Sequence, residues 1–154
     1  MEIEIINRIN DKIREVENFL LELNKIKPET LEEYKLNVEK KSACERFCEK
    51  IIEGSVDLTY LIVKSEIKKD KKFKIPEDDV QAFDILQKKN IITQTLSKKL
   101  QDAKGMRNFL AHQYGKVNDE IVFTAISEDL EDDISELLKS ISVYLNKTGK
   151  ENGS

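Results

Sequence analysis

Residues 44–62, CERFCEKIIEGSVDLTYLI, repeat small and apolar side chains at the three- and four-residue steps of one helix face. The pattern predicts a long helix that continues to about residue 67. Gly54 lies within it, at a point where another backbone can approach closely. We therefore expect this stretch to be the central helix of a bundle. Its inward face consists of Cys44, Phe47, Cys48, Ile51, Ser55, Leu58 and Ile62.

The preceding segment, residues 6–23, carries a heptad-like apolar seam that one helix presents to a neighbour. Pro28 is expected to end this helix, and Thr30 followed by Glu33 forms a capping box that starts a short helix ending near Asn37. The seam is most simply bundle core, although part of it would also suit a dimer surface. It consists of Ile6, Ile9, Ile13, Val16, Leu20 and Leu23.

Helix start and stop signals divide the rest of the chain up to residue 115. Residues 64–74 contain six lysines, and we expect a loop there. Pro76 and the acidic residues 77–79 suit the first turn of the next helix. Asn90 suits the left-handed backbone conformation that ends a helix. A further helix is expected from near Thr93 to a C-cap at Gly115.

The last helical region is expected from residue 119 to residue 146, with a break near Ser127. The polar residues 147–154 are expected to fray as a C-terminal tail. The chain therefore divides into a single helical domain, residues 1–146, and this tail, residues 147–154. The inward residues of the last helix are Leu130, Ile134, Leu137, Ile141 and Leu145.

The composition predicts an all-α fold, a compact antiparallel helical bundle. The chain has 154 residues, enough for one domain, and its five glycines and two prolines are too few for an all-β fold. A net charge of -4 argues against a protein that coats nucleic acid through bulk electrostatics. Without an apolar run near the roughly 18 residues of a membrane span, and without a signal peptide, we expect a cytoplasmic protein and no membrane contact.

The two cysteines, Cys44 and Cys48, are expected to be buried reduced thiols. Their four-residue spacing on a helix, with the single histidine far away in sequence, indicates neither a disulfide framework nor a metal pair. The chain also lacks a GxxxxGK[ST] phosphate loop and an HExxH zinc motif. We therefore expect no cofactor and no metal.

Residues 105–115, GMRNFLAHQYG, bring together the side chains suited to chemistry. At helical spacing, Arg107 and Tyr114 fall on one line, while Asn108 and His112 fall on another that Gly105 continues. The imidazole of His112 can accept or donate a proton near neutral pH, and the guanidinium of Arg107 can stabilise negative charge on a phosphate. These are parts for cleaving an RNA phosphodiester without a metal, in which His112 takes the 2′-OH proton.

One histidine does not make an acid and base pair. A two-histidine mechanism therefore requires a second protomer, so this chemistry predicts a symmetric homodimer with both motifs facing a shared cleft. From the residues alone, a lone histidine near a helix end is more often a surface or cap residue, and the spacing leaves both interpretations open.

The motif resembles the Arg-x-x-x-x-His-x-Tyr signature of the HepT-like branch of the HEPN superfamily, whose members are compact helical toxin ribonucleases that act as dimers. Residues 44–54 (CERFCEKIIEG), 75–78 (IPED) and 82–86 (AFDIL) extend the resemblance, which covers roughly residues 3–145. It implies a HEPN-like fold, with Arg107 and His112 as the catalytic pair and Asn108 as the polar neighbour that helps shape the site.

The resemblance also implies a regulator. In this branch a cognate minimal nucleotidyltransferase antitoxin silences the toxin by AMPylation of the motif tyrosine, which is Tyr114 here, as in a type VII-like toxin–antitoxin system. A bulky anionic adduct at Tyr114 would occupy the cleft and repel RNA. The alternative for Tyr114 is a core aromatic with a satisfied hydroxyl. The antitoxin's own signature is incomplete in this chain, since Gly54 and Ser55 lack the downstream Asp-x-Asp.

Other features leave alternatives open. A noncatalytic helical protein that binds a nucleotidyltransferase or a nucleotide is the second function we consider. The lysines of residues 64–74 would suit RNA phosphates or merely a solvated surface. The acidic residues 128–136 suit the N-terminal part of a helix and would also suit a basic partner. The lysines near the motif in sequence are Lys98, Lys99, Lys104 and Lys116.

Overall fold

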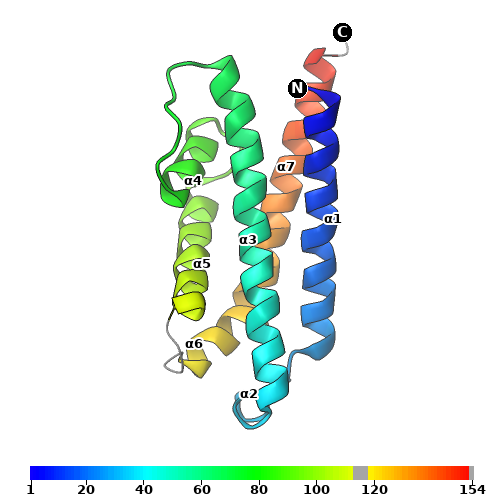
Figure 1. Ribbon diagram of the computed structural model, residues 1–154, viewed down its shortest axis with the longest axis vertical. Helices are drawn as coiled ribbons and strands as arrows, with labels where there is room; N and C mark the ends of the chain where they lie inside the picture. Colours follow the sequence, from blue (N-terminus) through cyan, green and yellow to red (C-terminus); the bar gives the residue numbers. More distant parts are fainter. Residues whose placement is uncertain (113–117, 153–154) are drawn as a thin grey trace.

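The computed structural model describes the backbone of residues 1–112 and 118–152, and the side chains of residues 1–111 and 118–149. Within this part of the chain the long helices α1 (Ile3–Ile26), α3 (Val38–Lys69), α5 (Gln94–His112) and α7 (Leu130–Asn152) form an antiparallel bundle (Figure 1). Shorter segments connect them. These are α2 (Leu31–Leu36), α4 (Asp79–Lys88), α6 (Asp119–Thr124) and a π-helical segment, η1 (Ala125–Asp129). The prediction of an all-helical bundle is confirmed.

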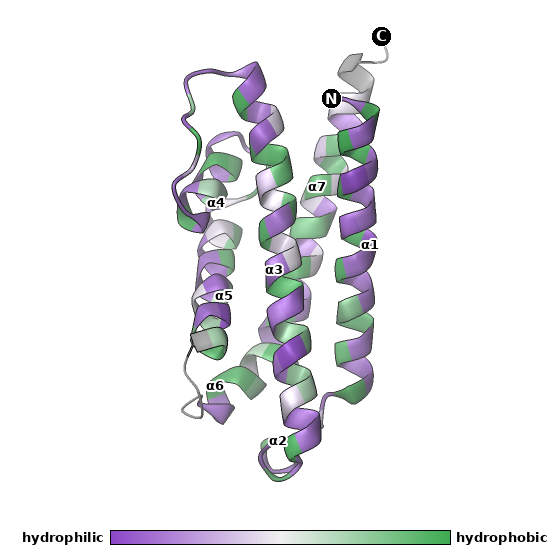
Figure 2. Ribbon diagram, in the orientation of Figure 1, coloured by the Kyte–Doolittle hydropathy of each residue, from purple (hydrophilic) through white to green (hydrophobic). Residues whose placement is uncertain are grey.

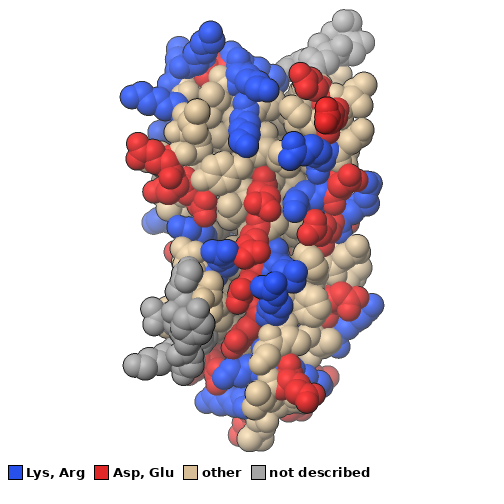
Figure 3. Space-filling model, viewed as in Figure 1, with Lys and Arg blue, Asp and Glu red and all other residues tan. Residues whose placement is uncertain are grey.

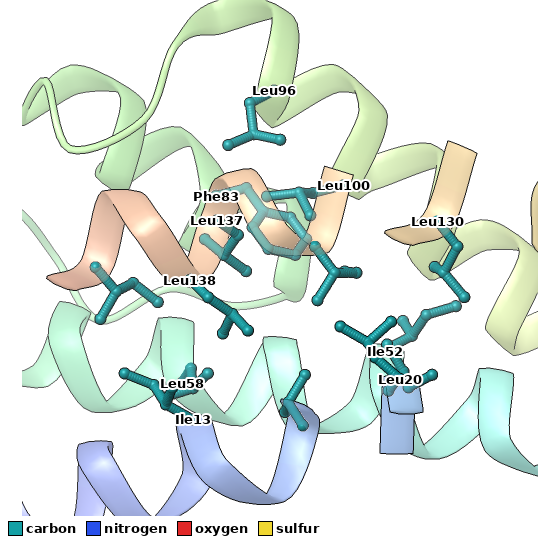
Figure 4. Close-up of a cluster of buried hydrophobic side chains, with 14 of the residues drawn as sticks. Ile13, Leu20, Ile52, Leu58, Phe83, Leu96, Leu100, Leu130, Leu137 and Leu138 are labelled. Carbon is teal, nitrogen blue, oxygen red and sulfur yellow. The ribbon is translucent and has the colours of Figure 1, made fainter. Parts of the chain in front are cut away.

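Helix α3 is the central element, because it contacts α1 on one side and α4, α5 and α7 on the others. Its predicted inward face is buried from Cys44 to Ile62, apart from the half-buried Phe47. The buried Ser55 hydroxyl donates to the carbonyl of Ile51 at 2.8 Å, so this polar residue keeps a hydrogen-bond partner inside the core. Figure 4 shows side chains from several helices meeting in this core, and Figure 2 shows apolar positions facing the bundle interior.

The cysteines are buried free thiols, as predicted. Burial disfavours the thiolate, and it raises the pKa of Cys48 to about 12 and the pKa of Cys44 above its usual value. Both side chains therefore act as small apolar groups in the core.

Side-chain caps set several helix boundaries where the sequence predicts them. The Thr30 hydroxyl accepts from the backbone N–H of Glu33 at 3.2 Å, at the start of α2. Asp78 caps α4 by accepting from the N–H of Gln81 at 2.9 Å, so the helix begins at Asp79, and Pro76 and Glu77 precede it instead of forming its first turn as predicted. Asn90 has a φ of 59°, which confirms the left-handed turn between α4 and α5. Gly115 lies outside the described residues.

Three further boundaries differ from the prediction. Residues 64–69 belong to α3 and not to a loop, because Ser65 and Glu66 are buried against neighbouring helices. The expected break near Ser127 is a π-helical segment that keeps the chain helical from α6 into α7. The expected fraying after residue 146 is also wrong up to Asn152, since α7 continues and Thr148 is only 3% exposed.

No helix in the described ranges is long and apolar enough to cross a membrane. The same ranges contain no group of three or more His, Cys, Asp or Glu side chains arranged to hold a metal ion.

Gly54 allows α1 to pack closely against α3. A Cβ atom at position 54 would lie 2.6 Å from Cγ2 of Val16, a buried β-branched side chain with little rotamer freedom in a helix. We predict that Gly54→Ala lowers the free energy of unfolding by roughly 1–2 kcal/mol, because overpacking outweighs the gain in helix propensity. Chemical denaturation measures this loss.

Gly105 provides the control, since it is exposed and a Cβ there would meet nothing within 4 Å. Gly105→Ala should raise the free energy of unfolding by up to about 1 kcal/mol through helix propensity alone. Combining Gly54→Ala with Val16→Ala should cost less than the sum of the two single changes. Additive costs would contradict the close contact.

Candidate active site

The motif lies in the last turns of α5. Arg107 and Asn108 are half-buried, and His112 is the final residue of the helix. The continuous helix keeps Asn108 and His112 one turn apart on the same side, as the spacing predicts. Tyr114 lies outside the described residues.

Arg107 is held by two side-chain oxygens. Its Nη2 donates to Oε1 of Glu53 on α3 at 2.7 Å, and its Nη1 donates to Oδ1 of the adjacent Asn108 at 3.2 Å. A guanidinium has five N–H donors in a planar fork, so these two contacts fix its orientation and leave further donors for a phosphate. Asn108 thus helps to orient the Arg107 side chain.

Glu53 is a candidate site residue that the sequence did not reveal, because it contacts Arg107 from another helix. The available signal was the four-residue spacing of Glu45, Glu49, Glu53 and Asp57, which places them on one side of α3. Figure 3 shows acidic side chains following this helix in a column. Only the packing of α5 against α3 brings one member of this column to Arg107.

A pocket of about 140 Å³ adjoins the ion pair between α3, α4 and α5. Carboxylates outnumber cations among its lining residues, so this side of the motif does not attract a polyanion by itself. Its polar lining consists of Glu53, Asp57, Asp79, Lys104 and Arg107.

A larger pocket of about 530 Å³ lies on another face of α5, against α6, η1 and α7. Lys99 and Asp133 stand in its wall, 3.5 Å apart, and burial raises the pKa of Asp133. Met106 is the motif residue that lines it in the described part of the chain, whereas Arg107 and Asn108 do not.

The lysines expected near the motif have different positions. Lys104 lines the small pocket with Arg107, whereas Lys99 pairs with Asp133 and Lys98 is exposed. Lys116 lies outside the described residues. The motif's described surroundings are therefore less basic than the sequence suggested.

Comparison with known families gives a direct result. The family described as Ribonuclease HepT-like matches residues 8–141. The chain belongs to the HepT-like ribonuclease family. This confirms the resemblance seen in the sequence, and the match includes the central helix, Glu53 and the motif.

Individual members of this family and of its fold are also similar. The chain is 28% identical over 150 residues to the tRNA nuclease HepT of Aphanizomenon flos-aquae, covering 97% of this chain and 91% of that protein. It is 33% identical over 70 residues to the mRNA nuclease HepT of Shewanella oneidensis, covering 46% of this chain and 53% of that protein.

A solved structure shares the fold of this HepT-like chain. It is the tri-AMPylated HEPN toxin of Shewanella oneidensis in complex with an MNT antitoxin, with a TM-score of 0.75 and 23% identity. The likeness covers 93% of this chain and 99% of that one. The bundle described above is therefore HEPN-like.

The Glu53 contact makes a prediction about Arg107. The pair is partly exposed, at 41% for Glu53 and 31% for Arg107, so Glu53→Gln should change the free energy of unfolding by less than about 1 kcal/mol. It should nevertheless free the guanidinium to rotate, because a neutral amide holds it more weakly than a carboxylate. The four arginines of the chain make side-chain ¹⁵N NMR a simple readout.

In the native protein we expect slow Nη rotation for Arg107 and faster rotation in Glu53→Gln. Arg14, whose pair with Asp11 is highly exposed, serves as the internal control and should not change. Equal rotation of Arg107 in both proteins would contradict a positioning role for Glu53.

Proposed function

We propose that this protein is a toxin endoribonuclease of a toxin–antitoxin system, and that Arg107 and His112 form its catalytic pair. The observation that carries the proposal is the match to a ribonuclease family across residues 8–141, together with Arg107 oriented by two oxygens on the helix that ends at His112. The names of its relatives, tRNA nuclease and mRNA nuclease, agree with RNA as the substrate class.

The proposed reaction is transesterification within RNA. A ring nitrogen of His112 takes the proton of a 2′-OH, the 2′-oxygen attacks phosphorus, and the bond from phosphorus to the 5′-oxygen breaks. Arg107 donates to the phosphoryl oxygens, where negative charge develops in the transition state. Asn108 and Glu53 keep the guanidinium aimed at this position. No step in this scheme needs a metal ion.

The leaving 5′-oxygen needs a proton, which requires a second group. The chain contains one histidine, so we propose that the protonated His112 of a second protomer supplies it in a homodimer. Gly105 and Asn108 lie on the same side of α5 as His112, and among the described residues no atom lies within 4 Å of a Cβ placed at Gly105. This leaves room for another chain or for RNA beside the motif.

Regulation is proposed to act through Tyr114. A cognate minimal nucleotidyltransferase antitoxin would transfer AMP from ATP to the Tyr114 oxygen and release pyrophosphate. Support comes from the AMPylated toxin in complex with its MNT antitoxin that shares this fold. The phosphate of the adduct would repel an RNA phosphate two residues from His112.

Cleavage of RNA tests the catalytic assignment. We expect purified protein to cut cellular RNA in EDTA, and Arg107→Ala and His112→Ala each to reduce the rate at least about 100-fold, the contribution of a general base or a charge-stabilising donor. Thermal unfolding of each variant checks its fold. If His112→Ala still cleaves RNA, the proposed mechanism fails, and a noncatalytic partner protein becomes the better assignment.

Mixed dimers test the second protomer. A heterodimer of an unaltered subunit with a His112→Ala subunit holds one His112, so it should lose nearly all activity if each cleavage needs a histidine from both protomers. Activity is measured after the unaltered protein is exchanged with an excess of His112→Ala, and native mass spectrometry verifies the exchange. Activity that stays proportional to the number of unaltered subunits would contradict a shared site.

AMPylation gives an independent prediction. With ATP and an MNT-type transferase from the same genome, the protein should gain the mass of at least one AMP group and lose nuclease activity. Tyr114→Phe should gain none at this position while it keeps its activity, because phenylalanine lacks the acceptor oxygen. Peptide mass spectrometry measures the site, and AMP on Tyr144 alone would contradict the assignment.

A further inference from the structure

Residues 64–74 form a strongly basic surface at the end of the bundle away from the motif. They divide between the last turns of α3 and the connection to α4, and Figure 3 shows basic side chains gathered over this region. All six lysines are exposed, although the whole chain carries a net charge of -4. The lysines are Lys64, Lys68, Lys69, Lys71, Lys72 and Lys74.

The two carboxylates in the same stretch are engaged by the body of the protein. Glu66 is 9% exposed, and the Tyr144 hydroxyl of α7 donates to it. Nζ of Lys89, just after α4, lies 2.9 Å from Oδ2 of Asp70 and 3.8 Å from Oε2 of Glu66. This ammonium lowers the pKa of Asp70, so the carboxylate stays ionised and paired.

Five of the six lysines are consequently available to a ligand. Lys69 lies 3.8 Å from Glu66, but the others have no carboxylate oxygen within 4 Å in the described part of the chain. We call Lys64, Lys68, Lys71, Lys72 and Lys74 the lysine surface.

Internal contacts hold the connection that carries the lysine surface. The Asp70 carboxylate accepts from the backbone N–H of Lys72 at 3.1 Å. Lys89 also lies over the Phe73 ring, 4.7 Å from its centroid, and Phe73 packs against the hydrophobic core. A surface that is already ordered loses less conformational entropy when it binds a ligand.

The lysine surface is separated from the motif along α3. At 1.5 Å per residue, Lys64 and Lys68 lie about 17 and 22 Å from Glu53, which contacts Arg107. Three carboxylates and two cations line the pocket beside Arg107, so the pocket provides no net attraction for the phosphates that the reaction needs. A strand of about six stacked nucleotides would span this separation, at roughly 3.4 Å per nucleotide.

We propose that the lysine surface is an RNA-anchoring site, which holds backbone phosphates about 20 Å from Arg107 and so selects long or structured RNA over short fragments. The inference rests on the proposed function, because it names the substrate class of the same enzyme. Several ammonium groups without carboxylate partners match the closely spaced charges of a phosphate backbone, and they bind it without reading its sequence. The anchor compensates for the acidic surroundings of the motif.

The test compares two variants, each in a His112→Ala background that prevents cleavage. The first changes Lys64, Lys68, Lys71 and Lys72 to Gln. The control removes four exposed lysines elsewhere, Lys25, Lys35, Lys40 and Lys139, and therefore has the same net charge. Fluorescence anisotropy measures binding to a labelled RNA hairpin of about 20 nucleotides, whose stem of roughly eight base pairs is about as long as the separation.

We expect the first variant to bind the hairpin at least about tenfold more weakly in 0.1 M salt. A plot of the logarithm of its binding constant against the logarithm of salt concentration should also become shallower, by about 0.7–0.9 for each phosphate that the variant no longer neutralises. The control should bind like the parent protein. Arginine at the same four positions should restore binding, which excludes misfolding as the cause. An RNA of about four nucleotides should bind the parent protein much more weakly than the hairpin does, because it cannot contact the lysine surface and the motif together.

Three results would overturn the proposal. The first is that the first variant binds the hairpin as tightly as the parent protein does. The second is that the control variant loses as much RNA binding as the first variant. The third is that the first variant loses binding only to vesicles that contain phosphatidylserine and not to RNA. The outcome is distinguishable from a failure of the proposed function, since binding is measured without cleavage. A protein that cannot cut RNA at all would still report whether the lysine surface binds it.

Discussion

The packing of α3 against α1, α4, α5 and α7 is the constraint on which the rest of the structure depends. Its inward face excludes water from Cys44 to Ile62, and Gly54 lets α1 pack against it without a side chain between them. A helix fixed in this way has no freedom to slide or rotate. Every group that it presents at its surface, Glu53 above all, therefore has a fixed position relative to α5.

The candidate active site follows from this rigidity. A guanidinium on a helix end is mobile when it faces only water, and holding it in place costs side-chain entropy. Here Glu53 and Asn108 orient Arg107 before any substrate binds. In the proposed reaction this preorganisation lets Arg107 meet developing charge without rearrangement. The acidic column along α3 also places negative charge beside the motif, so the motif by itself attracts RNA weakly.

Charge is consequently separated along the molecule. Acidic side chains follow α3 beside the motif, whereas lysines without carboxylate partners gather at the far end of the same helix, in the part of the chain that the structure describes. The pairing of Glu66 and Asp70 with Tyr144 and Lys89 sharpens this separation, because it withdraws negative charge from the basic end. Such an arrangement favours a long polyanion that contacts both ends over a small one.

The sequence by itself determined the helical class, the central helix, most helix starts and the family. These follow from local rules, since apolar spacing, capping side chains and a short motif act within a few residues of one another. Only the tertiary structure decided where α3 and α7 end, because Glu66 and Thr148 are buried by residues distant in sequence. It also decided the partner of Arg107, since Glu53 is 54 positions away and looks like any other exposed acidic residue in the sequence. Local patterns record what one segment prefers, whereas an ion pair between helices depends on how two segments pack.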